Sequence, residues 1–269
     1  MFLGDPSVGM MRGGRVQRRF YVGGQESVPN GLAFGDSGAK MYVLGQGNNT
    51  IYQYNLSTAW DVLTAAYAGK SFSVQATAGF GTHGVAFYGG NTVYALGNSN
   101  RRIYQYTLGT AWDISTASYT GKSFSVATQE TDPRDLFISP DGAGCLLSGG
   151  QNKIQRYNFG IFADISTLVH STTSPGLNSS SNWGLTYSND GMKCYTVGTS
   201  FLIEQYSVAS SYATSLTFEK SLSVPDQTPY PTSRRISSDG LQVYTLNEGD
   251  DLVRQYTLNI ALDISTGVY

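Results

Sequence analysis

The stretch Ile51-Tyr52-Gln53-Tyr54 (IYQY) returns four more times along the 269 residues of the chain. It recurs as IYQY at 103–106, IQRY at 154–157, IEQY at 203–206 and VRQY at 253–256, with spacings of 52, 51, 49 and 50 residues. A steady period of this length indicates an architecture in which each repeat is one supersecondary unit. We therefore expect five units, which start near residues 31, 84, 135, 184 and 233.

Each unit contains segments for four short strands. The opening segments are GLAF (31–34), GVAF (84–87), DLFI (135–138), GLTY (184–187) and SRRI (233–236). Asp-Gly follows in three units, at 141–142, 190–191 and 239–240, and this pair favours hairpin turns because both positions of a type I′ turn need positive φ. An outer segment ends the unit as SFSV (71–74 and 123–126) or SLSV (221–224). This content predicts one β-propeller blade per unit.

The two ends of the sequence indicate how the ring closes. The fifth unit stops at Tyr269, before its outer segment, while the N-terminal part holds an unmatched segment, Phe20-Tyr21-Val22. Val22 stands nine residues before Gly31, as Val126 does before Asp135. We predict an all-β, five-bladed propeller over residues 19–269, with four antiparallel strands per blade, in which the N-terminal strand completes the last blade and removes an exposed sheet edge.

Two polar series repeat and are interpreted as structural. The first, in the IYQY segments, is predicted to satisfy backbone groups between blades and comprises Gln53, Gln105, Gln205 and Gln255. The second is predicted to accept N–H groups of a following turn and comprises Asp61, Asp113, Asp164 and Asp263. The third unit has only SPGL (174–177) after these elements, so its outer strand is expected to be weak.

Composition excludes several classes of function. Charged residues make up 13% and the net charge is −2, so nucleic acid and anionic membranes are not expected as partners. The sequence contains no stretch of 18 apolar residues, so no membrane span is expected. The N-terminal residues lack the apolar core of a signal peptide. Cys145 and Cys194 are expected to be buried thiols, and His83 and His170 lie in different units, so neither a metal nor another cofactor is predicted.

The sequence also shows no clear set of catalytic residues. Glycoside hydrolysis usually needs two facing carboxylates, and the opening segments offer Asp135 alone, with Arg234 and Arg235 as their other charges. The acidic turn at 247–251 could hold calcium but lacks the alternating ligands of a dedicated loop, so a solvated turn is favoured. The chain is therefore predicted not to be an enzyme.

One position differs in every unit, directly before the opening segment. It holds Asn30, His83, Arg134, Trp183 and Thr232. Propeller topology brings these residues to one mouth of the channel, where varied polar and aromatic groups are typical of a binding site. Free drift of loop residues explains the variation equally well. We predict a ligand- or partner-binding site here, with Trp183 as its main contact.

Residues 1–18 form an arm outside the repeats. The arm is rich in glycine and carries apolar and basic residues that include Phe2, Leu3, Met10, Met11, Arg12 and Arg15. A flexible segment with apolar anchors typically becomes ordered by docking onto a preformed surface. We therefore predict that the arm docks onto a partner subunit.

The segments LSTAWDV (56–62) and LGTAWDISTASY (108–119), with SFSV, GLAF, Asp-Gly and IYQY, resemble a repeat of virion proteins in marine tailed bacteriophages. The resemblance covers about residues 19–269, and units three and four depart from it at the tryptophan and the outer strand. It implies a non-catalytic structural or host-attachment role in a tail tip, a fibre or a capsid surface.

The partners implied by the resemblance are other virion proteins and a host-surface glycan or protein, on a particle assembled in the host cytoplasm. The alternative is a five-bladed sugar-binding lectin, although a lectin normally repeats its sugar-contacting residues in every blade. A glycoside hydrolase is the least favoured function.

Overall fold

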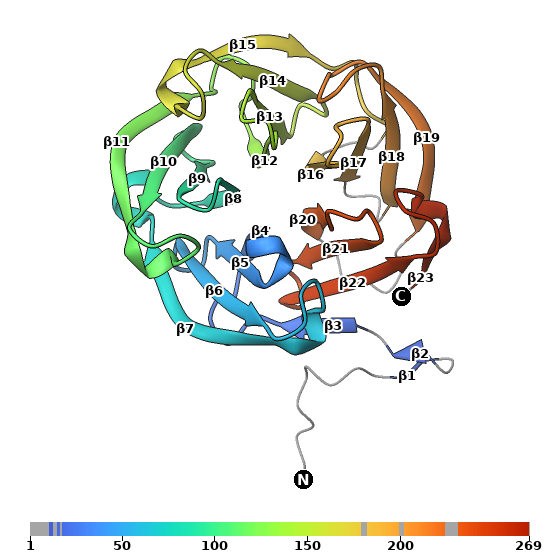
Figure 1. Cartoon of the computed structure of the whole chain (residues 1–269). Helices are drawn as coiled ribbons and strands as arrows, with labels where there is room; N and C mark the ends of the chain where they lie inside the picture. Colours follow the sequence, from blue (N-terminus) through green and yellow to red (C-terminus); the bar gives the residue numbers. More distant parts are fainter. Residues whose placement is uncertain are drawn as a thin grey trace.

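The computed structural model describes residues 11–12, 15–16, 18–178, 182–198, 202–223 and 231–268. Five antiparallel sheets are arranged around a central axis, each with its first strand innermost (Figure 1). The predicted five-bladed propeller is confirmed.

The first two blades follow the repeat most closely. Blade one consists of β4 (Pro29–Gly35), β5 (Lys40–Gly45), β6 (Thr50–Leu56) and β7 (Ala65–Ser73). Blade two consists of β8 (Thr82–Tyr88), β9 (Thr92–Gly97), β10 (Arg102–Leu108) and β11 (Ala117–Ser125). The short helices in and between them are η1 (Asp36–Gly38), η2 (Val62–Thr64), α1 (Gln75–Ala78) and η3 (Ile114–Thr116).

The third and fourth blades have the same strand order. Blade three consists of β12 (Pro133–Ile138), β13 (Gly144–Gly149), β14 (Ile154–Phe159), η4 (Ile165–Thr167) and β15 (Leu168–Thr173). Blade four consists of β16 (Asn182–Tyr187), β17 (Lys193–Gly198), β18 (Leu202–Val208) and β19 (Leu216–Ser223). The outer strand expected to be weak, β15, is present but has six residues where β7 has nine.

Both ends of the chain build the outer edge of blade five. Its continuous strands are β20 (Pro231–Ile236), β21 (Gln242–Asn247) and β22 (Leu252–Leu258), followed by η5 (Ile264–Thr266) and β23 (Gly267–Val268). The first half of β22 pairs with β3 (Arg18–Tyr21), in the register Val253 to Phe20, and its last two residues pair with β23. The predicted closing strand is confirmed, with the addition that β23 supplies part of the same edge.

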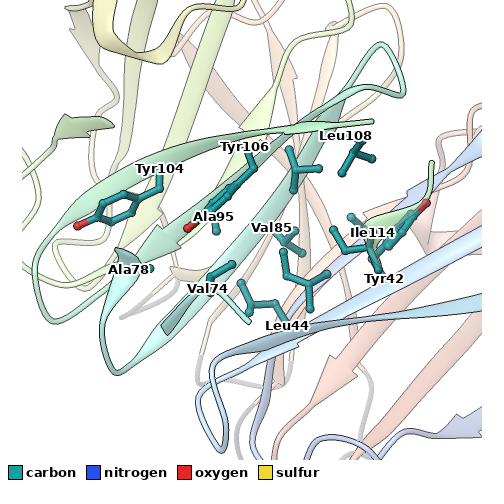
Figure 2. Packing of buried hydrophobic residues seen from close by; sticks show 13 residues of the cluster. Tyr42, Leu44, Val74, Ala78, Val85, Ala95, Tyr104, Tyr106, Leu108 and Ile114 are labelled. Atoms are coloured by element: carbon teal, nitrogen blue, oxygen red, sulfur yellow. The ribbon is translucent and has the colours of Figure 1, made fainter. Parts of the chain in front are cut away.

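Apolar rows from adjacent blades form the core. Figure 2 shows the seam between blades one and two, where Tyr42 and Leu44 lie near Val85 and Ile114. The repeated isoleucine and tyrosine rows of the IYQY strands are buried in all five blades, with no member more than 4% exposed. Because both faces of each sheet are covered by neighbouring blades, these strands have apolar residues on both faces.

The repeated glutamines join each blade to the next, as predicted. Gln53 Oε1 accepts a hydrogen bond from the Ile114 N–H of blade two at 3.0 Å. Gln255 Oε1 of blade five accepts one from the Val62 N–H of blade one at 3.0 Å, so the series runs across the closure. Blade three has Arg156 instead, which donates to the Tyr212 carbonyl at 3.0 Å.

The repeated aspartates also have the predicted local role. Each caps the short helix after it; Asp113 Oδ1, for example, accepts from the Ser115 N–H at 3.1 Å. The same carboxylates also form ion pairs with the outer strand of the previous blade, such as Lys70 with Asp113 at 2.6 Å. At the closure Arg18 pairs with Asp61 at 2.6 Å, so Arg18, assigned to the arm from sequence, belongs to the propeller.

The innermost strands lie unusually close to one another. A Cβ atom added at Gly31 would lie 2.3 Å from the His83 carbonyl oxygen of the next blade, and one at Gly84 would lie 2.9 Å from the Leu136 nitrogen. Glycine is therefore required at the first position of these opening segments. The equivalent positions of blades three and five carry Asp135 and Ser233.

Part of the predicted arm lies outside the described residues, including Phe2, Leu3 and Met10. β1 (Met11–Arg12) and β2 (Arg15–Val16) pair with each other as a two-stranded hairpin, which lies outside the ring (Figure 1). Among the described residues no helix is long and apolar enough to cross a membrane.

Candidate functional site

The five variable positions share one backbone feature. The pairing of each innermost strand with the second strand of its blade shifts register at the variable residue, which marks a β-bulge or similar irregularity. The shifts fall at Asn30, at His83 with Gly84, and at Arg134, Trp183 and Thr232. Bulges change the direction of side chains and are common beside functional sites. The backbone irregularity therefore repeats in every blade even though the side chain at this position differs.

Arg134 and Trp183 form the most accessible part of this ring. The Arg134 guanidinium carbon lies 4.9 Å from the centre of the Trp183 ring, a cation–π contact between blades three and four. Arg134 also donates from Nε and Nη2 to Asp132 Oδ2 at 3.0 and 2.8 Å. Both Arg134 and Trp183 are half-buried, so each retains surface for a partner.

The other three members of the ring are buried. Asn30 Nδ2 donates to the Val28 carbonyl at 3.2 Å, and Thr232 Oγ1 donates to the Pro29 carbonyl at 3.0 Å. Burial, and secondarily the Arg134 charge, lowers the pKa of His83 to about 4. His83 is therefore neutral at pH 7, and these three residues support the mouth more than they line an open surface.

Asp135, the one carboxylate on the innermost strands, is fully buried in a knot of hydrogen bonds. Arg235 Nη1 donates to its Oδ2 at 2.9 Å and Nη2 donates to its Oδ1 at 3.2 Å. The backbone N–H groups of Leu136 and Leu185 also donate to this carboxylate, at 2.9 and 3.1 Å. Burial raises the pKa of Asp135 while these partners oppose the rise. Each oxygen of this carboxylate thus accepts at least two hydrogen bonds.

The knot connects all five blades. Arg235 of blade five donates to the carbonyls of Val85 and Leu185, in blades two and four, each at 3.1 Å. Ser233 Oγ accepts from the Leu32 N–H of blade one at 3.3 Å and donates to Asp135 of blade three at 3.3 Å.

Arg234 points away from the knot. Its side chain packs against Gly184 of blade four, as expected from strand alternation, and occupies the place of a leucine or valine in the other blades. Burial lowers the pKa of Arg234 to about 9. Its three guanidinium nitrogens have no hydrogen-bond partner among the residues that the structure describes.

A cavity that the sequence did not suggest lies at the opposite end of the innermost strands from the ring of variable residues. It has a volume of about 200 Å³, and all five innermost strands line it near their C-terminal ends. Phe34, Phe87, Phe137 and Tyr187 form much of the wall, and Arg235 of the knot also lines it. The one feature of the sequence that could have indicated this cavity is the aromatic residue that ends several opening segments.

Of the remaining candidate groups, the buried thiols are confirmed, whereas the acidic turn is partly buried where a solvated turn was expected. Cys145 and Cys194 are buried free thiols, and burial raises the pKa of both. In the acidic turn at 247–251, Asp250 forms an ion pair with Arg254, while burial and the neighbouring carboxylates raise the pKa of Asp251 to about 6. The described part of the chain contains no group of three side chains suited to a metal ion.

No family model matches the chain, and no curated protein matches it either. Solved structures do. A protein from Bacteroides uniformis, proposed to be a 6-phosphogluconolactonase, superposes with a TM-score of 0.53 at 16% identity, over 88% of this chain and 67% of that one. A protein from Lactobacillus plantarum gives 0.55 at 15% identity, over 89% and 69%.

What these proteins share with the chain is the β-propeller fold. A second protein proposed to be a 6-phosphogluconolactonase, from Bacteroides fragilis, gives a TM-score of 0.52 at 14% identity, over 88% of this chain and 67% of that one. The chain thus spans about two thirds of the length of each of these three structures. At this level of identity the likeness carries neither substrate nor activity.

Proposed function

We propose that this propeller is a non-catalytic structural and attachment module of a bacteriophage particle. The resemblance of its repeats to those of phage virion proteins suggests the setting. The observation that carries a binding role is the Arg134–Trp183 contact at the channel mouth, because a half-exposed tryptophan held by a cation gives a large contact area at low entropic cost. The saturated carboxylate of Asp135 argues against hydrolysis.

The chemistry of the mouth favours a protein partner with both apolar and charged groups. Arg134 lies near two carboxylates. Asp132 forms an ion pair with it. Burial raises the pKa of Glu248, and the positive charge of Arg134 partly opposes this rise. A partner that covers Trp183 therefore meets mixed charge around an aromatic centre, and tryptophan and arginine are among the residues enriched at interface hot spots.

The test is Trp183→Ala, scored by incorporation of the protein into particles and by particle adsorption to host cells. We expect a loss of one or both, with unchanged thermal unfolding. Ile161→Ala is the matched control because Ile161 is 63% exposed and lies in a turn at the other end of the blades. Normal incorporation and adsorption of the Trp183 variant would remove the ring from the proposal.

The arm is the second attachment device in this proposal. Deletion of residues 1–17 leaves β3 intact, so the propeller should fold normally while incorporation into particles is lost. Normal incorporation of the truncated protein would show that the arm does not attach it. Turnover of glycosides by the purified protein, abolished in Asp135→Asn, would contradict the non-catalytic role.

A further inference from the structure

The cavity at the C-terminal ends of the innermost strands combines aromatic walls with a polar rim. Phe34, Phe87 and Phe137 are only partly buried. Asn189 and Ser238 lie on exposed turns and contribute amide and hydroxyl groups. A ligand in this cavity therefore meets aromatic side chains on its sides and hydrogen-bonding groups at its edge.

The aromatic walls are held in place by contacts between blades. The Phe34 ring lies 4.4 Å from that of Tyr244, and the Phe87 ring lies 4.1 Å from that of Tyr42. The Tyr42 hydroxyl in turn donates to the Trp112 carbonyl at 2.7 Å. Because these rings are packed before any ligand arrives, little ordering entropy is lost on binding.

The cavity is electrically balanced. Arg235 is the one charged residue in its lining, and the bidentate pair with Asp135 compensates that charge. An anion gains little from a guanidinium that is already paired, and a cation meets no free carboxylate in the lining. The lining therefore suits a neutral ligand that has both an apolar face and polar edges.

The size of the cavity points to one small ring. At about 200 Å³ it is smaller than the roughly 300–1,000 Å³ of sites that enclose drug-sized ligands. A second hollow of about 420 Å³ shares Phe34, Trp60, Phe87 and Asn189 with it and continues toward Asp36 and Trp112. A chain of linked rings can therefore place one unit in the cavity and extend along the hollow.

We propose that this cavity binds a pyranose unit of a neutral glycan. The C–H faces of a pyranose pack on aromatic rings, and its hydroxyl groups exchange hydrogen bonds with amide and hydroxyl groups such as those of Asn189 and Ser238. A single site on the axis, shared by all five blades, needs no separate sugar-binding site in each blade. The inference rests on the proposed attachment function, for which the glycan is the host-surface ligand, but it concerns the end of the propeller opposite to Trp183.

The experiment uses the purified full-length chain and a panel of glucose, galactose, mannose and N-acetylglucosamine, with their β-linked and α-linked disaccharides. Binding is read by saturation-transfer NMR and by tryptophan fluorescence, since Trp60 lines both hollows. We expect at least one saccharide to bind with a dissociation constant below about 10 mM, as suits a small site with few hydrogen bonds.

Two variants locate the site. Asn189→Ala removes one hydrogen-bonding side chain and should weaken binding roughly three- to tenfold. Phe87→Leu removes one aromatic face and should weaken it at least as much, with folding checked by thermal unfolding. Asn91→Ala, an exposed asparagine in a turn at the same end but outside the lining, should leave binding unchanged.

Failure of the whole panel to bind would overturn the proposal, as would binding that neither Asn189→Ala nor Phe87→Leu weakens. If an apolar peptide bound at the cavity, Asn189→Ala or Phe87→Leu weakened that binding, and no saccharide bound, the site would belong to a protein partner. This result would also overturn the glycan proposal. None of these results depends on particle assembly, so the glycan inference and the role of Trp183 fail separately.

Discussion

Arg235 and Asp135 form a bidentate ion pair across the axis of the propeller, with N–O distances of 2.9 and 3.2 Å between blades five and three. Both residues are buried, their other hydrogen bonds reach blades two and four, and Ser233 links Asp135 to blade one. This pair thus joins innermost strands that do not lie next to each other in the ring. It also separates the variable mouth from the aromatic cavity.

Removal of one partner should be costly. Asp135→Ala leaves the Arg235 charge buried without compensation, and we expect it to lower the free energy of unfolding by about 3–5 kcal/mol in urea titrations. Lys122→Ala breaks the exposed pair between Lys122 and Asp164 and should cost less than about 1 kcal/mol. Comparable losses in the two variants would show that the central pair has no special role.

The glutamine at the closure should also contribute measurably. Gln255→Leu leaves the buried Val62 N–H without its acceptor, and an unsatisfied buried donor costs about 1–3 kcal/mol. Thr257 lies two residues further along the same strand and has an exposed side chain. Thr257→Val should therefore change the free energy of unfolding by no more than about 0.5 kcal/mol. The measurement is chemical unfolding of both variants, and equal effects would contradict the expected role of the interblade bond.

Two truncations distinguish the closing strand from the arm. Deletion of residues 1–24 removes β3, the Arg18–Asp61 ion pair and the contact of Phe20 with Tyr54, and exposes the edge of β22. We expect its thermal midpoint to fall by more than about 10 °C, whereas deletion of residues 1–17 should leave it within a few degrees of the full chain. Equal midpoints for the two truncations would mean that β3 is not needed for closure.

His83 should make stability depend on pH. Its pKa of about 4 in the folded protein lies below its ordinary value of about 6.5, so the unfolded chain takes up a proton first as the pH falls. The stability due to neutral His83 is fully present above pH 6.5 and is lost as the pH falls toward 4, by up to about 3 kcal/mol.

The comparison with His83→Gln isolates this effect. Burial raises the pKa of Glu26 and Glu130, which therefore act in the opposite direction over the same range. The quantity to measure is the difference in unfolding free energy between wild type and variant at pH 7 and at pH 4.5. This difference should shrink as the pH falls, and a constant difference would exclude titration of His83.

The repeat carried enough information to predict the blades, the closure and the interblade glutamines, because each of these depends on a residue type or a spacing that returns in most of the units. The Asp135–Arg235 pair was not predictable in this way, since its members are 100 residues apart and belong to blades that are not adjacent. Strand alternation alone separates Arg234 from Arg235, but only the ring geometry shows which of the two reaches the axis.

The cavity was missed for a related reason. Phe34, Phe87 and Tyr187 each end an apolar strand, a position that does not by itself indicate a cavity. Only the convergence of five strand ends turns them into the wall of a shared space. The variable mouth was found because variation stands out against a repeat, yet three of its five residues are buried, which sequence variation cannot reveal.

The composite edge of blade five also bears on how the chain folds. Blades one to four are each formed from neighbouring segments, so they can assemble in order as they become available. In the last sheet β3 pairs with β22, which lies more than 200 residues later in the sequence, so β3 stays unpaired until β22 has formed. Contacts of such sequence separation form slowly, so ring closure should limit the rate of folding, and a chain interrupted before β22 would display an open sheet edge to its neighbours.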